Sequence, residues 1–173
     1  MLLDPEGHFF NANLGPKIKM EKMPLWIKGL KVNTKQNVIF SWSQLKVCFN
    51  DLSGKILFRY KKLTSYEDCI TDIFVSEKYN YFVTSTTSGR IIVWKLQKKK
   101  YLIHTYIGHF KTVTSMMVIP ERPTLFISAS NDNTLRMFSL DKFMELYRFE
   151  LNPGINNILL SSKVFAHFYY DDK

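Results

Sequence analysis

The chain contains two segments of matching chemistry that lie 44 residues apart, FVTSTTSGRIIVWK at 82–95 and FISASNDNTLRMFS at 126–139. Phe82 and Phe126 are the only identical pair, yet six further pairs match in chemistry: Val83 with Ile127, Thr84 with Ser128, Thr86 with Ser130, Ile91 with Leu135, Val93 with Met137 and Trp94 with Phe138. A self-similar period of this length is typical of repeat proteins in which each repeat is one small supersecondary unit. The period therefore constrains the fold more strongly than any single motif does.

Alternating apolar segments separated by polar turns divide each repeat into four short strands. In residues 134–139, Leu135 and Met137 alternate with Arg136, which predicts a strand buried mainly on one side. Pro123 cannot donate to a central ladder, so we expect a turn at 121–123. The expected strands are 113–118, 125–130, 134–139 and 144–149 in the clearest repeat, 70–75, 81–86, 90–96 and 101–107 in the preceding one, and 25–32, 37–42, 45–49 and 56–60 in a weaker first one.

Four-stranded repeats with a period of 40–45 residues predict an all-β fold, a partial β-propeller of about three and a half four-stranded antiparallel blades. A generic antiparallel β protein with two similar hairpins is the alternative. Because unfinished blades expose apolar faces and strand edges, we expect further sequence or another chain to complete the propeller. The expected divisions are an N-terminal arm at 1–24, a degenerate blade at 25–62, a blade at 63–107, the best-formed blade at 108–150 and the start of a truncated fourth blade at 151–173.

The unit at 108–150 resembles a blade of the WD-repeat family, whose type member is the G-protein β subunit. It has a Gly108-His109 pair, a second strand of small residues, Asp132 in the following turn and Phe138 in the position of the family's tryptophan. The resemblance implies a buried structural tetrad formed by His109, Asp132, Phe138 and either Ser128 or Ser130. Phe138 lacks an N–H donor, so this chain of hydrogen bonds would be one bond short.

The unit at 63–107 shows complementary losses. Trp94 is present, but Ser65-Tyr66 stands where the family has Gly-His, and Ser88-Gly89 replaces the aspartate turn. Degenerate repeats rich in Lys and aromatic residues look like those of large WD-repeat proteins of the cytoskeleton and cilium. The resemblance thus implies a protein-interaction scaffold, with an axonemal or microtubule-associated role as the specific hypothesis.

The residues give little sign of catalysis. His109, Ser128 and Asp132 could suggest a catalytic triad, but a nucleophile needs an exposed, activated hydroxyl, and these residues belong to one predicted sheet. Cys48, Cys69, His104 and His109 lack metal-ligand spacing, and Ser53-Gly54-Lys55 lacks the rest of a phosphate loop. We therefore expect a non-enzyme without cofactor or metal.

The turns of the predicted blades sort the charged residues into two rims. Turns at one end of the blades carry a candidate basic rim, and turns at the other end carry a mixed, aromatic rim. The lysine run at 98–100 is the strongest charge cluster of the basic rim, although such a run is more often a solvated turn. The basic rim consists of Lys78, Lys98, Lys99, Lys100 and Arg122, and the opposite rim of Tyr66, Glu67, Asp68, Phe110 and Lys111.

The formal net charge is +9, and residues 1–62 hold eleven Lys or Arg against four Asp or Glu. Such a charge favours acidic partners, for which a tubulin surface is one candidate. Lysines interleaved with Trp26, Trp42 and Tyr60 also permit nucleic-acid binding, but aromatic residues on strands usually pack, so we expect proteins instead. An RNA-processing scaffold and an adaptor for an enzyme complex remain alternatives.

We expect a soluble intracellular protein of the cytoplasm, cytoskeleton or axoneme, without a membrane segment. The expectation rests on the presence of two cysteines, on the early Asp4-Pro5-Glu6 and on the lack of a long apolar run.

Overall fold

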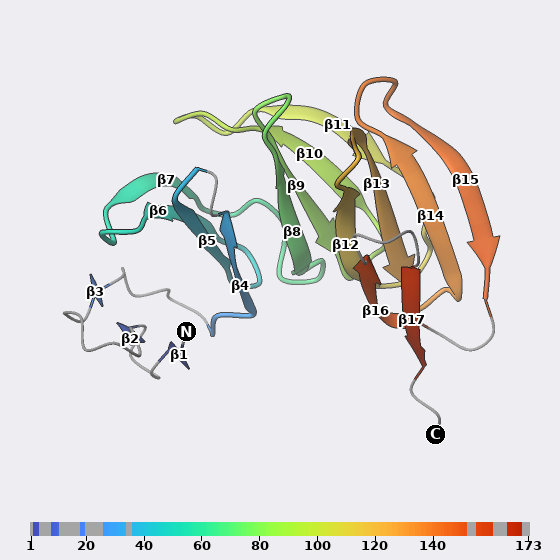
Figure 1. Ribbon diagram of the computed structural model, residues 1–173, viewed down its shortest axis with the longest axis horizontal. Coiled ribbons are helices and arrows are strands. Elements are labelled where there is room, and N and C mark those ends of the chain that lie inside the picture. Colours follow the sequence, from blue (N-terminus) through green and yellow to red (C-terminus); the bar gives the residue numbers. More distant parts are fainter. Residues whose placement is uncertain are drawn as a thin grey trace. The chain divides into compact units, whose positions relative to one another are not determined.

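A computed structural model of the chain describes residues 26–33 and 36–151 in full, and elsewhere only the backbone of five short strands (Figure 1). In the fully described residues, every regular element is a strand, and the strands form three four-stranded antiparallel sheets. This confirms the predicted all-β fold of propeller blades. The chain divides into two compact units, residues 1–64 and residues 65–173, which are described separately.

The first unit contains one blade, whose strands follow each other in space in chain order. Aromatic rings fill its interior, with Phe49 centred 5.8 Å from Phe40 and 6.0 Å from Tyr60. A Cβ atom on Gly29 would lie 2.1 Å from the Trp42 ring, so this position requires glycine. The strands are β4 (Gly29–Asn33), β5 (Val38–Trp42), β6 (Val47–Asp51) and β7 (Ile56–Tyr60).

The second unit contains two consecutive blades, which we call blade 2 and blade 3. In each blade the chain moves from one edge of the sheet to the other, one hairpin at a time. Blade 2 comprises β8 (Ile70–Ser76), β9 (Tyr81–Thr86), β10 (Ile91–Lys95) and β11 (Leu102–Tyr106), and blade 3 comprises β12 (Val113–Ile119), β13 (Arg122–Ser130), β14 (Thr134–Ser139) and β15 (Met144–Glu150).

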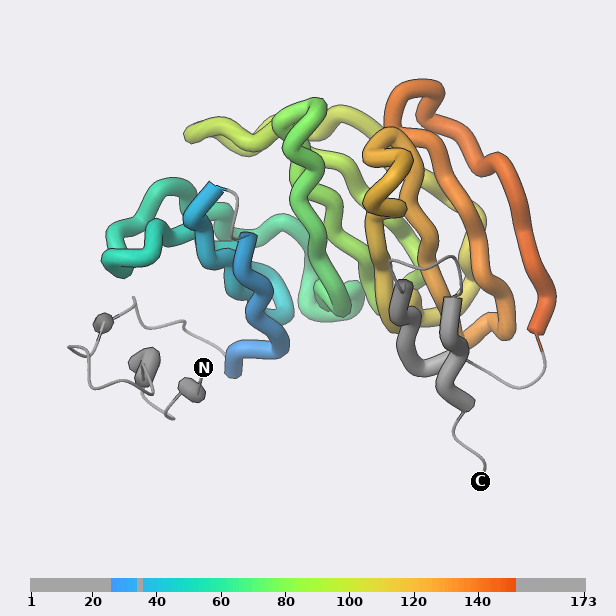
Figure 2. Tube along the Cα trace, viewed as in Figure 1, coloured from blue at the N-terminus to red at the C-terminus, as the bar shows by residue number. Residues whose placement is uncertain are grey.

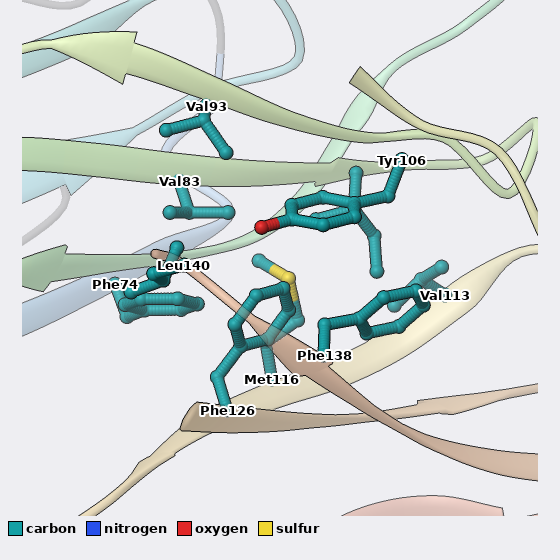
Figure 3. Close-up of a cluster of buried hydrophobic side chains, with 10 residues drawn as sticks. Phe74, Val83, Val93, Tyr106, Val113, Met116, Phe126, Phe138 and Leu140 are labelled. Atoms are coloured by element: carbon teal, nitrogen blue, oxygen red, sulfur yellow. The ribbon is translucent and has the colours of Figure 1, made fainter. Parts of the chain in front are cut away.

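Blades 2 and 3 share one hydrophobic core, to which both sheets contribute buried side chains (Figure 3). Phe126 and Phe138 stack with ring centroids 5.2 Å apart, and Tyr106 of blade 2 lies 4.9 Å from Phe138. Aromatic pairs at these separations add to the free energy gained by removing their apolar area from water. The core members are Phe74, Val83, Ile91, Val93, Tyr106, Val113, Met116, Phe126, Phe138 and Leu140.

Three hydrogen bonds also join the two blades. The backbone N–H of Met116 donates to the Asp72 carboxylate at 2.8 Å, and the Tyr106 hydroxyl donates to the Ser139 carbonyl at 2.6 Å. The Thr112 hydroxyl donates to the Thr87 carbonyl at 3.0 Å. Because these bonds lie at different places along the shared interface, they fix the angle and register of one blade against the other.

Three local predictions were wrong. Trp26 does not pack on a strand, because β4 begins at Gly29 and Trp26 is 92% exposed. Arg122 and Pro123 begin β13 instead of forming a turn, because Arg122 pairs with Ile119 after the short turn at Pro120 and Glu121. The strand at 134–139 is not buried mainly on one side, since Arg136 is only 5% exposed. Polar partners on the second side of the sheet make this burial possible, as described below.

Two further groups of strands are described by their backbones alone. A hairpin follows blade 3, formed by β16 (Ile155–Leu160) and β17 (Ala166–Tyr170), and three very short strands lie near the N-terminus, β1 (Leu2–Leu3), β2 (His8–Phe10) and β3 (Ile18–Lys19). The predicted arm at 1–24 and truncated blade at 151–173 otherwise fall outside the described residues and stay predictions.

Candidate functional site

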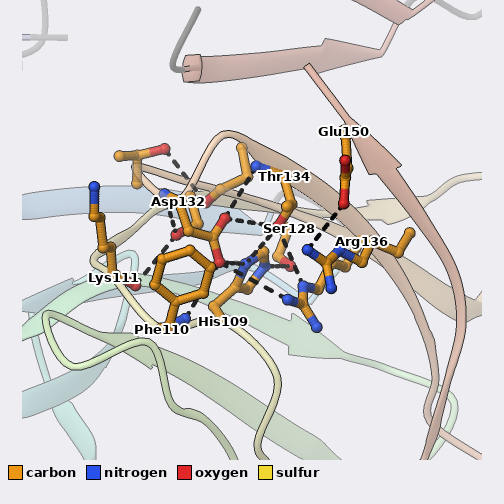
Figure 4. A network of polar contacts seen from close by, with 12 residues as sticks. His109, Phe110, Lys111, Ser128, Asp132, Thr134, Arg136 and Glu150 are labelled. Carbon is orange, nitrogen blue, oxygen red and sulfur yellow. Dashed lines mark hydrogen bonds and ion pairs between the residues drawn. The ribbon is translucent and has the colours of Figure 1, made fainter. Parts of the chain in front are cut away.

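The most polar buried feature of blade 3 is a network centred on His109, which lies in the loop before β12 (Figure 4). His109 Nδ1 lies 2.9 Å from the Asp132 carboxylate, and Nε2 lies 2.7 Å from the Ser128 hydroxyl. The backbone N–H of Phe110 also donates to Asp132, at 3.2 Å. The network therefore ties the loop before the first strand to the second strand and to the turn after it.

The protonation state of this network follows from its burial. Burial lowers the pKa of His109 and outweighs the opposing effect of Asp132, so the imidazole is neutral at neutral pH. Burial alone would raise the pKa of Asp132, but hydrogen bonds from Thr134 and His109 lower it to about 2. A neutral ring satisfies both contacts when Nδ1–H donates to Asp132 and the Ser128 hydroxyl donates to Nε2.

Arg136 extends the network toward β15. Its Nε donates to the Thr134 hydroxyl at 3.2 Å, and the same hydroxyl donates to Asp132 at 2.6 Å. Its Nη1 forms an ion pair with Glu145 at 2.8 Å. A buried arginine needs such partners, because an unpaired charge out of water is costly. Strand alternation predicted that Arg136 faces outward, but Arg136 is a buried structural member of the blade.

The order Ser128, His109, Asp132 reproduces the contacts of a catalytic triad, but not its accessibility. The side chains of His109 and Asp132 have no exposed surface, and Ser128 is 0% exposed. A nucleophilic hydroxyl must reach a substrate carbonyl and an oxyanion site. With its hydroxyl enclosed and bonded to His109, Ser128 is arranged to hold the blade together.

The other two predicted tetrad members of blade 3 lie nearby with separate contacts. Ser130 accepts a hydrogen bond from the backbone N–H of Asp132 and donates to the Lys111 carbonyl, so Ser128 is the serine that contacts His109. Phe138 lies edge-on to His109 with centroids 6.4 Å apart. The Phe138 ring contributes apolar packing, whereas a tryptophan at this position would also donate a hydrogen bond from its indole N–H.

Blade 2 achieves the corresponding link with other residues. Asp68, in the loop before β8, accepts hydrogen bonds from the backbone N–H of Ser88 at 2.8 Å and from Arg90 Nε at 3.0 Å. Burial alone would raise the pKa of Asp68, but these bonds lower it. Trp94 donates its indole N–H to the Thr84 hydroxyl at 3.0 Å.

Asp68 therefore lies at the predicted opposite rim but is 4% exposed and paired. Arg90 and Thr84 were not predicted as members of this link. An acid two residues before the first strand and a cation just after the Ser88-Gly89 turn are the signal that could have indicated the pair.

The remaining residues of the two predicted rims are exposed. Within the second unit, the loops after β8, β10, β12 and β14 lie at one end of the sheets (Figures 1 and 2). Lys78, Lys98, Lys99 and Lys100 lie in or near these loops, and Arg122 is the first residue of β13. At the other end, Tyr66 is 73% and Phe110 65% exposed, accompanied by Glu67, Lys111 and the unpredicted Ile107, which is 85% exposed.

One polar pocket of about 340 Å³ lies at the end of blade 3 and is lined by Asp132, Asn133, Thr134, Arg148, Glu150 and Leu151. Arg148 and Glu150 pair across it at 3.1 Å. No cluster of three His, Cys, Asp or Glu able to hold a metal ion occurs in the described part of the chain. The same residues include no helix long and apolar enough to cross a membrane.

Comparison with known proteins adds three findings. The family profile described as WD domain, G-beta repeat, matches residues 100–139, which span β11 to β14. The chain is 36% identical over 78 residues to NACHT domain- and WD repeat-containing protein 1 of Mus musculus, covering 45% of the chain and 5% of that protein. It is 25% identical over 85 residues to eukaryotic translation initiation factor 3 subunit I of Drosophila grimshawi, covering 49% of the chain and 26% of that protein.

Among solved structures, the WD40 repeats of RRP9 superpose with a TM-score of 0.68 at 18% identity, covering 80% of this chain and 43% of that one. At this identity the likeness concerns the fold. The chain thus spans only a small part of the curated relatives it matches and under half of this structural neighbour.

Proposed function

The chain contains a WD40 repeat and has the WD40 β-propeller fold, and we propose that it is a non-catalytic scaffold that binds other proteins through the loops at the ends of its blades. One fold hosts many functions, so the proposal depends on the residues that the loops present. The observation that carries it is the division between enclosed polar networks and exposed rim side chains. His109, Ser128 and Asp132 are used inside the blade, whereas lysines and aromatic residues face outward.

The partner that best fits the basic rim is an acidic protein surface. Lys98 and Lys99 are exposed and have no ion-pair partner among residues 26–33 and 36–151. Charged groups of this kind raise association rates with surfaces of opposite sign. We propose a place in a large cytoskeletal assembly, microtubule-associated and ciliary or axonemal, in which the acidic surface of tubulin is the partner.

Co-sedimentation of the full chain with microtubules tests this proposal. We expect the bound fraction to fall steeply between low and physiological salt, and to fall further in the variant Lys98→Glu/Lys99→Glu. A matched variant, Lys61→Glu/Lys62→Glu, changes the same net charge in the first unit and should retain more binding. Equal binding by all three proteins at low salt contradicts the role of the basic rim.

A scaffold that works with RNA is the second candidate, because one similar protein is a subunit of a translation initiation factor. Its signature is a salt-dependent affinity for RNA with a steep slope of log affinity against log salt concentration. Filter binding with a mixed-sequence RNA measures this slope. Tighter binding to RNA than to microtubules at the same salt favours this candidate.

The outer face of the blade 3 sheet carries exposed aromatic rings, which a further propeller blade would cover. Tyr147 and Phe149 of β15 stack on this face and are 61% and 48% exposed. They continue a buried cluster formed by Ile127, Ala129 and Leu135. We expect additional strands, from further sequence or another chain, to cover them. A purified chain that sediments as a stable monomer with these rings accessible would falsify that expectation.

A further inference from the structure

We propose that blade 2 carries a preformed binding site for an acidic peptide segment, built from two stacked tyrosine rings flanked by two lysine side chains. The site consists of Lys78, Tyr79, Tyr81 and Lys95, and we call it the lysine–tyrosine ladder. It rests on the proposed function and deepens it, because it names the residues and the chemistry by which an acidic partner is recognised.

The ladder is continuous in space. The Tyr79 and Tyr81 rings stack with centroids 5.6 Å apart and planes 21° apart. Lys78 Nζ lies 5.3 Å from the Tyr79 centroid, and Lys95 Nζ lies 5.0 Å from the Tyr81 centroid. Two stacked rings are therefore flanked by two ammonium groups, which hold each other's geometry through cation–π contacts.

The backbone beneath the ladder is fixed before any ligand arrives. The Leu96 N–H donates to the Asn80 carbonyl at 2.9 Å, and the Asn80 side chain donates back to the Leu96 carbonyl at 3.2 Å. Asn80 has a φ of 54°, a left-handed conformation that asparagine tolerates. Tyr79 and Tyr81 also pack against the core shared by blades 2 and 3. A site held in this way loses little conformational freedom on binding.

The charge around the ladder favours an anion. Lys98, Lys99 and Lys100 follow β10 directly, and Lys100 Nζ lies 5.3 Å from the Trp94 ring. Together with Lys78 and Lys95, five lysines of blade 2 lie at this end, and the two blade 2 loops there, 77–80 and 96–101, contain one acid, Glu77. Several such charges reinforce one another more than an isolated surface ion pair would.

The packing of the two tyrosine rings favours a carboxylate ligand over a nucleic acid. Base stacking needs a free aromatic face, but Tyr79 and Tyr81 face each other and are approached by Lys78 and Lys95. Their hydroxyls, in contrast, have no hydrogen-bond partner within the fully described part of the chain. Hydroxyl donors beside ammonium groups suit the oxygens of glutamate and aspartate side chains.

Blade 3 supplies a natural control at the same place in the repeat. At the 44-residue offset, Lys78 and Lys95 correspond to Arg122 and Ser139, while the two tyrosines correspond to Pro123 and Leu125. This end of blade 3 has one matching cation and neither ring. An acidic segment should therefore prefer blade 2 although the two blades share the same strand order.

Fluorescence anisotropy of the full chain with a labelled peptide of ten glutamates tests the inference. We expect Lys78→Glu/Lys98→Glu/Lys99→Glu to weaken binding about tenfold or more, from several lost charge contacts of modest size each. Tyr79→Phe/Tyr81→Phe keeps the packed rings and should weaken binding about threefold through the lost hydroxyl donors. Arg122→Glu, the blade 3 control, should change binding by less than about twofold.

Three results overturn the inference: equal effects of the blade 2 lysine variant and Arg122→Glu, no effect of removing the two hydroxyls, or tighter binding of a uridine decamer than of the glutamate peptide under the same salt conditions. Circular dichroism of each variant shows that the sheets are intact. Failure here is separable from failure of the proposed function. If microtubule co-sedimentation persists without peptide binding at the ladder, the ladder is wrong and the scaffold proposal stands.

Discussion

Blades 2 and 3 form the same link with opposite chemistry. In blade 3 the loop before the first strand supplies His109 and the turn after the second strand supplies the acid, Asp132. In blade 2 the loop supplies the acid, Asp68, and the cation, Arg90, follows the turn. Both arrangements connect the loop to the turn across the end of the sheet.

This exchange of acid and cation shows that a blade requires a polar link between the loop and the turn, whichever of the two segments supplies the acid. The two aromatic positions differ in a matching way. Thr84 of blade 2 receives the indole N–H of Trp94, whereas Ser128 of blade 3 is already bonded to His109 and tolerates Phe138. Blade 3 lacks the family's tryptophan, whereas blade 2 lacks its Gly-His pair and its turn aspartate and joins loop to turn through Asp68 and Arg90 instead.

Removing the acid from each link should give the largest effect and separate the two blades. Asp132→Ala leaves His109 and buried N–H groups without an acceptor, and we expect a loss of about 4 kcal/mol in the free energy of unfolding. Asp68→Ala should cost about 2 kcal/mol, because its partner Arg90 is half exposed and can turn to water. Urea unfolding followed by circular dichroism measures both. Equal losses would contradict the difference in burial on which this order depends.

Exchanging the turn residues tests how closely the blades pack. Gly89 has a φ of 88°, and a Cβ atom there would lie 2.4 Å from the His109 carbonyl oxygen. Gly89→Asn should therefore destabilise the protein by about 3 kcal/mol, although asparagine occupies the equivalent Asn133 at a φ of 61°. The reverse change, Asn133→Gly, should stay within about 0.5 kcal/mol. Thermal melts of the Gly89→Asn and Asn133→Gly variants measure both changes in stability. If Gly89→Asn leaves the stability unchanged, the loop at His109 does not constrain the turn at Gly89.

Replacing Trp94, the aromatic hydrogen-bond donor of blade 2, should have an intermediate effect on stability. Trp94→Phe gives blade 2 the residue found in blade 3, but it leaves the buried Thr84 hydroxyl without its donor and opens space beside Phe82. We expect a loss of about 2 kcal/mol. Adding Thr84→Val should recover part of it, because the orphaned hydroxyl is removed. No recovery in the double variant, measured by urea unfolding, would mean that lost packing alone accounts for the cost.

Acid should weaken the His109 network of blade 3 before the Asp68–Arg90 link of blade 2. The folded-state pKa of His109 lies below that of an exposed histidine, so its contribution is complete above about pH 6.5 and is lost as the pH falls below that value. Asp132, with a pKa of about 2, adds a second loss below about pH 3.8. His109→Gln should flatten the first loss, measured as the urea midpoint from pH 7 to 5. His104→Gln measures how much of the same loss comes from blade 2, since burial also lowers the pKa of His104. An unchanged slope in His109→Gln would contradict the neutral, buried histidine.

The fold was predictable because the 44-residue period and the strand alternation are local properties of the sequence. The family resemblance implied that His109, Asp132 and Phe138 belong to one network, and left Ser128 and Ser130 unresolved. Geometry separates the two serines: Ser128 meets His109, and Ser130 meets the backbone of Asp132. Which member of a small-residue strand faces a loop depends on register, which this spacing does not determine.

The features that were not predicted from the sequence depend on contacts between separate strands and loops. Arg136 was expected to face solvent because a charge on a strand usually does, and its burial depends on Glu145 nine residues away. The Asp68–Arg90 pair joins residues 22 apart that no family motif aligns. The ladder likewise joins a turn after β8 to the end of β10. Each of these contacts joins residues that are apart in the sequence, and the residues around each partner do not indicate the other.

The central claim is that blade 2 offers an acidic partner a surface that blade 3 lacks, although both blades share one architecture. Amide hydrogen exchange of the full chain with and without the ten-glutamate peptide tests it directly. The account predicts protection confined to residues 77–81 and 95–101, with residues 120–125 and 139–143 of blade 3 unchanged. Equal protection of both blades, or protection of the blade 3 segments alone, would contradict it.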